Sequence, residues 1–216
     1  ALGRFETVGY DLLAMVADKP GDARLEVFLA SFYRSIGEGK KAEEHMATAR
    51  SLSPRKQAII LQQGAIALSL GKNDEALKFF KEAFELVTEN DEAREYYVGA
   101  LFLNKDAATA RTIIAEGSDA FRKRLAQSDF VVSAVNTAQE YSTLAELYEE
   151  RVAADTTNAQ NWASLAFVYY QLKQTDKAIE TLARAAKAVP AFATTAECIT
   201  KNLQAGKEPQ LGCQPQ

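Results

Sequence analysis

The chain has 216 residues, of which 47% are hydrophobic and 25% charged, and its formal net charge is -4. This composition excludes a disordered chain, since the apolar surface is large enough to offset the entropy lost on ordering. It also disfavours a dedicated nucleic-acid binder, which usually carries a basic excess. The single histidine, His45, is expected on a solvent-facing helix surface. With one histidine and two cysteines, we expect no metal, no cofactor and no enzymatic activity.

No stretch of the chain predicts a membrane span. The longest uncharged run, residues 156–172, is interrupted by Thr, Asn, Gln and Ser, so this chain is not expected to insert into a membrane by itself. The sequence starts at Ala1 and opens directly into a helical pattern, which favours a processed protein or a piece of a longer one.

The prolines of the chain are periodically spaced. Pro20, Pro54 and Pro190 are the prolines ahead of the C-terminal tail, and 54 − 20 is 34 while 190 − 54 is 136, four times 34. A fixed period of this length indicates a solenoid of helical repeats. The period divides residues 23–192 into five units, which are 23–56, 57–90, 91–124, 125–158 and 159–192.

The segments outside the five units also predict helices. Residues 1–22 are interpreted as a half-repeat helix, because residues 2–18 carry Val8, Leu12 and Met15 at the apolar positions of a second helix. Residues 193–207 predict one capping helix of the kind that closes a solenoid. Gly206 and Pro209 then stop the helix, so residues 208–216 are expected to form a tail.

Small and bulky residues recur at fixed positions of the units. Position 20 reads Ala42, Ala76, Ala110, Leu144 and Ala178, and position 24 reads Met46, Phe80, Ile114, Tyr148 and Leu182. Small residues at a crossing, with large ones a turn away, suit helix axes about 8–10 Å apart. Units three and four depart from this pattern, and we expect them to be the least stable because bulky side chains crowd their crossings, namely Val98, Val132, Leu144 and Arg151.

The last unit resembles the tetratricopeptide repeat family at each signature position, which are Trp162, Leu165, Ala166, Tyr169, Ala178, Leu182, Ala185 and Pro190. The first two units resemble it at most positions, including Gly37 and Gly71 at the turn between helices. The resemblance implies an all-α, right-handed superhelical solenoid of antiparallel helix pairs. It also implies a non-catalytic scaffold that binds a partner segment in a concave groove. A structural module for self-association is the alternative.

In the family, fixed positions of each first helix line that groove. The resemblance therefore implies an apolar strip with two acidic residues, made of Leu61, Leu68, Glu95, Phe102, Asp129, Phe167 and Tyr170. The Lys and Asn with which chaperone-binding members clamp a terminal carboxylate are missing. We expect a protein or peptide partner with apolar and basic residues. Burial of the same side chains against neighbouring helices, or against a dimer mate, is the alternative.

Cys198 falls on the expected capping helix and Cys213 in the tail, fifteen residues apart. Two interpretations stay open for this pair. The cysteines are either free thiols in a reducing compartment or partners in a disulfide that pins the tail. A disulfide would imply an oxidising compartment.

Three stretches, residues 53–57, 90–97 and 159–192, resemble a narrower group. These are the tetratricopeptide regions attached C-terminally to bacterial O-antigen ligase-like membrane proteins, which polymerise or transfer lipid-linked polysaccharide. In that group the chemistry belongs to a membrane part that this chain lacks, so no catalytic residue is implied. The resemblance implies an accessory domain on the periplasmic or cell-surface side of the membrane, against the alternative of a free-standing scaffold.

Overall fold

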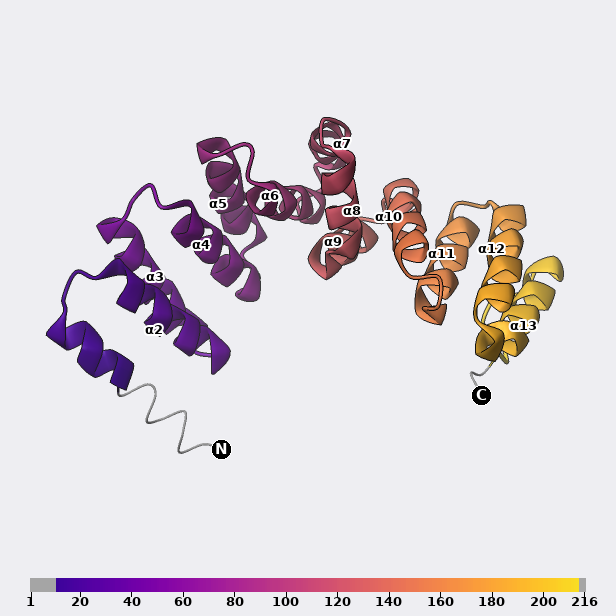
Figure 1. Ribbon diagram of the computed structural model, residues 1–216, viewed down its shortest axis with the longest axis horizontal. Coiled ribbons are helices and arrows are strands. Elements are labelled where there is room, and N and C mark those ends of the chain that lie inside the picture. Colours follow the sequence, from indigo (N-terminus) through magenta and orange to yellow (C-terminus); the bar gives the residue numbers. More distant parts are fainter. Residues whose placement is uncertain (1–10, 214–216) are drawn as a thin grey trace. The chain divides into compact units, whose positions relative to one another are not determined.

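The computed structural model describes residues 11–213, and every regular element within them is a helix (Figure 1). This confirms the expected all-α fold of antiparallel helix pairs. The chain divides into two compact units, unit 1 (Ala1–Ala110) and unit 2 (Arg111–Gln216). Of the expected N-terminal helix over residues 2–18, residues 11–18 are helical and the rest lies outside the described residues. No helix between residues 11 and 213 is both long and apolar enough to cross a membrane.

Unit 1 is built from successive helices that pack each on the next. They are α2 (Ala23–Ser35), α3 (Gly39–Leu52), α4 (Gln57–Ser69), α5 (Asn73–Leu86) and α6 (Asp91–Leu103). The short helix α7 (Ala107–Ala115) runs across the division between the units.

After α7, the described part of unit 2 contains six α-helices and one 3-10 turn. They are α8 (Asp119–Gln127), α9 (Asp129–Thr137), α10 (Tyr141–Ala154), α11 (Ala159–Gln171), α12 (Thr175–Ala188), η1 (Pro190–Phe192) and α13 (Ala193–Gln204). Helix α10 packs on α8, α9 and α11, and α12 packs on α11 and α13. The expected capping helix is thus α13.

The 34-residue period is present in the backbone as well as in the sequence. First helices end at residues 35, 69, 103, 137 and 171, and second helices begin at residues 39, 73, 107, 141 and 175. Each turn between them contains one left-handed residue, and these are Gly37, Gly71, Lys105, Gln139 and Lys173. The amide of the residue after the left-handed one donates back across the turn to the first helix. For example, Lys72 N–H donates to the carbonyl of Ala67 at 2.9 Å. The same helix cap therefore recurs five times.

The small residues that the repeat places at helix crossings lie in the core. Ala42, Ala76 and Ala178 are fully buried, as is the bulky Phe80 one turn from Ala76. Gly64 shows why the position opposite must be small, because a Cβ built there would collide with the ring of Phe80. Close approach of the helices in unit 1 thus depends on residues without large side chains.

The structure differs from five unbroken helix pairs between residues 116 and 128. Helices α3, α5, α10 and α12 end at residues 52, 86, 154 and 188, each of which is a multiple of 34 away from residue 120. The second helix of the third unit should therefore end near residue 120, but α7 ends at Ala115. Helices α2, α4, α6 and α11 begin at residues 23, 57, 91 and 159, each of which is a multiple of 34 away from residue 125. The first helix of the fourth unit should therefore begin at residue 125, but α9 begins at Asp129. Helix α8, which the repeat does not predict, fills the gap.

Helix caps mark where this irregular segment begins and ends. Before the first helices of units one, three and five stand Asp22, Asn90 and Asn158, whose side chains accept hydrogen bonds from following amides, whereas Lys56 before α4 makes no such bond. Arg124 stands at this position in the fourth unit, and arginine carries no acceptor. Ser118 and Ser128 cap instead, starting α8 and α9 with bonds of 3.1 and 3.4 Å.

Candidate functional site

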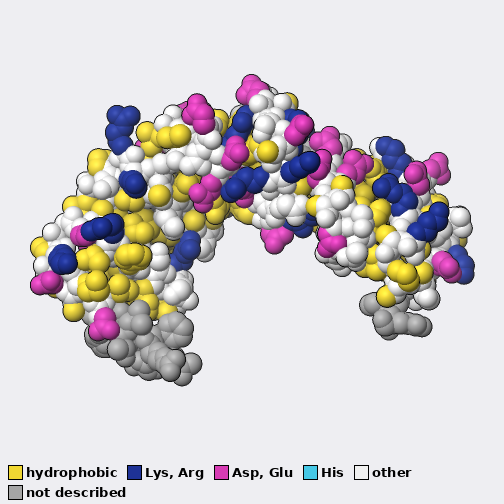
Figure 2. Space-filling view, viewed as in Figure 1, with side chains coloured by type: hydrophobic (Ala, Val, Ile, Leu, Met, Phe, Trp, Pro, Cys, Tyr) yellow, Lys and Arg dark blue, Asp and Glu magenta, His cyan; other side chains and the backbone are white. Residues whose placement is uncertain are grey.

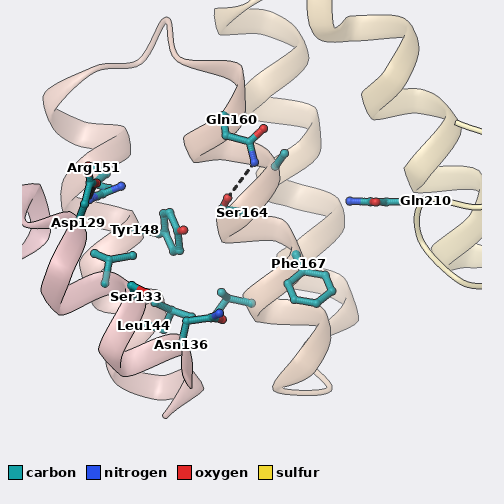
Figure 3. Close-up of a pocket in the computed structure, with 13 residues that line it drawn as sticks. Asp129, Ser133, Asn136, Leu144, Tyr148, Arg151, Gln160, Ser164, Phe167 and Gln210 are labelled. Atoms are coloured by element: carbon teal, nitrogen blue, oxygen red, sulfur yellow. Dashed lines mark hydrogen bonds and ion pairs between the residues drawn. The ribbon is translucent and has the colours of Figure 1, made fainter. Parts of the chain in front are cut away.

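A cavity of about 550 Å³ lies in unit 2, and we call it the unit 2 cavity (Figure 3). Helices α9, α10 and α11 and the C-terminal tail supply its walls. Much of the lining is polar without being charged, and these side chains are Ser133, Asn136, Tyr148, Gln160, Ser164 and Gln210. Amides and hydroxyls offer both donors and acceptors, so the lining can bond a polar ligand of either kind.

One face of α11 forms the wall that carries an aromatic side chain. Ala163 and Ser164 lie four and three residues before Phe167, so both share the face of the helix that carries its ring. The first two are small and leave room, while the ring of Phe167 lies at the cavity with 43% of the residue's surface exposed. Leu165 and Tyr169, on other faces of α11, are buried. The helix thus separates a packing face from an open face with one large ring.

Arg151 of α10 holds together the wall where α8 gives way to α9. Its Nε donates to the carbonyl oxygen of Ala126, one of the groups released at the end of α8. Its Nη2 lies 2.7 Å from Oδ1 of Asp129, and its guanidinium lies over the ring of Tyr148 at 5.8 Å. Crowding of a helix crossing by Arg151 stays a prediction, but its long side chain also has a bonding role, because it bonds the helix break.

This ion pair also sets the charge of the cavity. Asp129 and Arg151 are the charged residues that line it, and they lie within one salt bridge. The Asp129 side chain is 96% exposed, so its carboxylate faces solvent beside the guanidinium. The cavity therefore has a polar, nearly neutral lining.

Behind the cavity, α10 and α11 are joined by a tyrosine. The hydroxyl of Tyr169 donates to the carboxylate of Glu149. Burial raises the pKa of Tyr169 to about 12, and the hydrogen bond to Glu149 adds to the rise. The phenol therefore stays protonated at neutral pH and keeps donating to Glu149, which fixes the spacing of two cavity walls.

The last wall comes from the C-terminal tail. Cys198 of α13 and Cys213 form a disulfide, so the structure has the bridged form of the two arrangements that the sequence allows. Asn202 of α13 donates through Nδ2 to the carbonyl oxygens of Pro209 and Leu211, at 3.1 and 2.8 Å. These contacts seat the tail on α13.

The groove residues expected in unit 2 lie close to this cavity. Asp129 and Phe167 line it directly. Tyr170 borders a smaller space of about 20 Å³ next to it, which Phe167 and Pro209 also line. Both rings are thus at or beside the same concave surface.

The groove residues expected in unit 1 lie elsewhere. Phe102 is 1% exposed and Leu61 8% exposed, whereas Leu68 and Glu95 are half-buried. Phe102 and Leu61 are therefore core residues, and the expectation that they face a partner is corrected. Burial in the core removes more of their apolar surface from water than a place in an open groove would.

Sequence reasoning missed several residues of the cavity. Asn136 and Gln160 occupy positions 12 and 2 of their units, which are groove positions of the family, so the repeat was sufficient to find them. Tyr148 and Arg151 belong to a second helix, and Gln210 belongs to the tail. No repeat position points to those three.

His45 is not the solvated residue that the sequence predicts. Its Nδ1 lies 2.8 Å from Oε2 of Glu26, and its ring stacks on Tyr33 with 5.3 Å between centroids. Because Glu26 lies on α2 and His45 on α3, this contact joins the two helices. In the part of the chain that the structure describes, no cluster of three or more His, Cys, Asp or Glu side chains could hold a metal ion.

Comparison with known families identifies repeats in both halves of the sequence. Residues 67–128 match one model described as a tetratricopeptide repeat, and residues 159–191 match a second with the same description. A sequence search among curated proteins gives no match.

Solved structures share the fold at low identity. A tetratricopeptide repeat protein from Parabacteroides merdae is 13% identical with a TM-score of 0.65, covering 97% of this chain and 80% of its own. PilF from Pseudomonas aeruginosa is 18% identical with a TM-score of 0.62, covering 95% and 91%. YrrB, described as having an unusual peptide-binding site, is 15% identical with a TM-score of 0.58, covering 83% and 92%. These likenesses establish the fold alone.

Proposed function

Since the chain belongs to the tetratricopeptide repeat family of protein-interaction scaffolds, we propose that its unit 2 cavity binds an extended segment of a partner protein. The exposed ring of Phe167 in a concave surface of mixed polar and apolar side chains carries the proposal. A large ring in a hollow loses water when a partner covers it, and such anchors supply much of the energy of an interface. The peptide-binding site described for YrrB supports this use of the fold.

The lining defines the chemistry of the partner segment. An apolar side chain would cover the rings of Phe167 and Tyr170, while the amides of Asn136 and Gln160 would bond the partner's main chain. A Lys or Arg of the partner would approach the exposed carboxylate of Asp129. Because Arg151 already neutralises much of that charge, the apolar anchor contributes more than the basic residue.

Selection from random-sequence peptides displayed on phage, with the oxidised chain as target, tests the proposal. The affinity of a selected peptide is then measured for the wild type and for Phe167→Ala. Phe28→Ala is the matched control, because Phe28 is an exposed phenylalanine on a helix of unit 1. We expect loss of binding in Phe167→Ala and none in Phe28→Ala. Equal affinity of all three proteins, or a selection without binders, would contradict the proposal.

Self-association is a second candidate, favoured by exposed apolar residues near the N-terminal end of unit 1. Leu13, Met15, Phe28 and Ile36 are 41%, 48%, 59% and 43% exposed. Hydrophobic side chains gather over this part of the molecule in Figure 2. Apolar surface of this kind is used in contacts between proteins. Sedimentation equilibrium of the wild type and of Phe28→Asp tests this self-association. We expect the wild type to form a dimer and the aspartate variant to be a monomer.

On the narrower resemblance, we propose in addition that the scaffold serves a cell-envelope polysaccharide ligase or polymerase outside the cytoplasmic membrane. The Cys198–Cys213 disulfide supports an extracytoplasmic site, because disulfides persist in oxidising compartments. The reading frame upstream of Ala1 tests this. Hydrophobic spans in the same gene would support the membrane-enzyme assignment, and a cytosolic fusion partner would contradict it.

A further inference from the structure

We propose that the C-terminal tail, residues 207–213, is a functional wall of the unit 2 cavity, and that Gln210 contacts the bound partner segment from it. The Cys198–Cys213 disulfide holds this wall in place. The inference rests on the proposed function of the cavity, and it adds a binding residue that the repeats themselves do not contain.

The tail turns back directly after α13 and lies against it. Gly206 is left-handed with φ of 65°, and Lys207 N–H donates across the turn to the carbonyl of Asn202 at 2.9 Å. The chain then runs back toward α11, where Pro209 is buried beside Tyr170. A proline ring in a space lined by apolar side chains loses its contact with water, so the seat of the tail is partly hydrophobic.

Three contacts fix the backbone on both sides of Gln210. The side-chain amide of Asn202 bonds the carbonyl oxygens of Pro209 and Leu211, which flank Gln210 in sequence. The disulfide ties Cys213, three residues further on, to α13. The backbone of Gln210 is therefore positioned by its neighbours, and its own side chain is not needed to attach the tail to α13.

The side chain of Gln210 is directed at the cavity. Figure 3 shows its amide extending from the tail toward α11, on the side of the cavity away from Arg151. Gln210 lines both the unit 2 cavity and the smaller space beside Tyr170. Within residues 11–213 the side-chain amide makes no hydrogen bond, so its donor and acceptor are both open to a ligand.

A glutamine amide matches the main chain of an extended segment. It donates to a peptide carbonyl and accepts from a peptide N–H, the two groups that every residue except proline presents. Asn136, on α9, offers the same pair of groups from another wall. The tail therefore adds a contact that is indifferent to the partner's side chains, and its pre-organisation by the disulfide lowers the entropy lost on binding.

The test uses the full chain and the phage-selected peptide that binds the wild type in oxidised form. Affinities are measured for Gln210→Ala, for Cys198→Ser with Cys213→Ser, and for Gln204→Ala as the matched control, since Gln204 is an exposed glutamine of α13. We expect about fivefold weaker binding for Gln210→Ala, the loss of one hydrogen bond. The double serine variant should weaken binding at least as much, and Gln204→Ala should not change it.

The outcomes separate this inference from the function on which it rests. If Phe167→Ala weakens binding while Gln210→Ala and the double serine variant bind like the wild type, the cavity stands and the tail proposal is refuted. If Phe167→Ala has no effect either, the proposed function fails first.

Hydrogen exchange without any ligand provides an independent measurement. The amides of Leu211 and Cys213 bond within the tail, and we expect them to lose protection in the double serine variant. Unchanged protection there would show that the disulfide does not hold the wall, and would count against the proposal.

Discussion

Arg151 of α10 and Asp129 of α9 form an ion pair, with 2.7 Å between Nη2 and Oδ1, while Nε of the same guanidinium donates to the carbonyl of Ala126. One side chain thus bonds the end of α8 and the start of α9. At this repeat position other units carry small residues such as Ala49 and Ala185, which cannot reach so far. The arginine and the irregular helices of this region therefore belong together.

Arg151→Ala is expected to destabilise the protein, although alanine is the usual residue at this position. The substitution leaves the Ala126 carbonyl without its donor, which costs about 1–3 kcal/mol for a buried polar group. Arg151→Lys keeps the charge but loses the fork of donors, so its stability should fall between the two. Urea unfolding followed by circular dichroism measures this. An alanine variant as stable as the wild type would mean that the arginine bonds are not needed.

Glycine at a left-handed turn position is expected to stabilise the chain. Gln139 has φ of 57° at the position where Gly37 and Gly71 stand in the first two units. Gln139→Gly removes the steric cost of that conformation, and the expected gain is about 0.5–1 kcal/mol after the added backbone entropy. The reverse change, Gly71→Ala, should lower stability. Thermal unfolding that moves in the opposite direction in either variant would contradict the account of the turns.

The raised pKa of Tyr169 predicts that the protein loses stability at alkaline pH. Burial and Glu149 raise its pKa to about 12, so the folded chain keeps a proton that the unfolded chain loses first. Its contribution is complete below pH 10 and is lost as the pH rises to 12. The difference in unfolding free energy between the wild type and Tyr169→Phe should therefore shrink across this window. A constant difference would show that the hydroxyl is not protected by the fold.

The amides of α8 and α9 should exchange hydrogen faster than those of α10 and α12 in unit 2. Helices α8 and α9 have nine residues each, against fourteen in α10 and α12. Short helices have few internal hydrogen bonds relative to the cost of starting them. Exchange in α8 and α9 as slow as in α12 would refute this order.

The repeat could be predicted from sequence because a few residue types carry it. Ala42, Ala76 and Ala178 mark the crossings, and Gly37 and Gly71 mark the turns. Lys105 and Lys173 take the same left-handed backbone without any residue-level sign, since only the period places them. Periodicity thus compensates for residues that would not be chosen for such a turn.

Helix α8 was missed because two local caps compete with the period. Ser118 and Ser128 each precede an aspartate, a common helix start, but a 34-residue frame takes no account of such local starts. Gln210 was missed for another reason. Its place depends on the pairing of Cys198 with Cys213, which is one of two arrangements that the sequence allows, and on the Asn202 amide, whose contacts with the tail no repeat position indicates.

The double variant Phe167→Ala with Tyr170→Ala tests the central claim most directly. Its affinity for the selected peptide is measured by calorimetry, and its fold by circular dichroism under the same conditions. We expect binding to weaken by about 2 kcal/mol or more, as for anchor residues at interfaces, while the helices and the unfolding midpoint are kept. If the variant unfolds and loses binding only in proportion, the rings are core residues and the unit 2 cavity is not a binding groove.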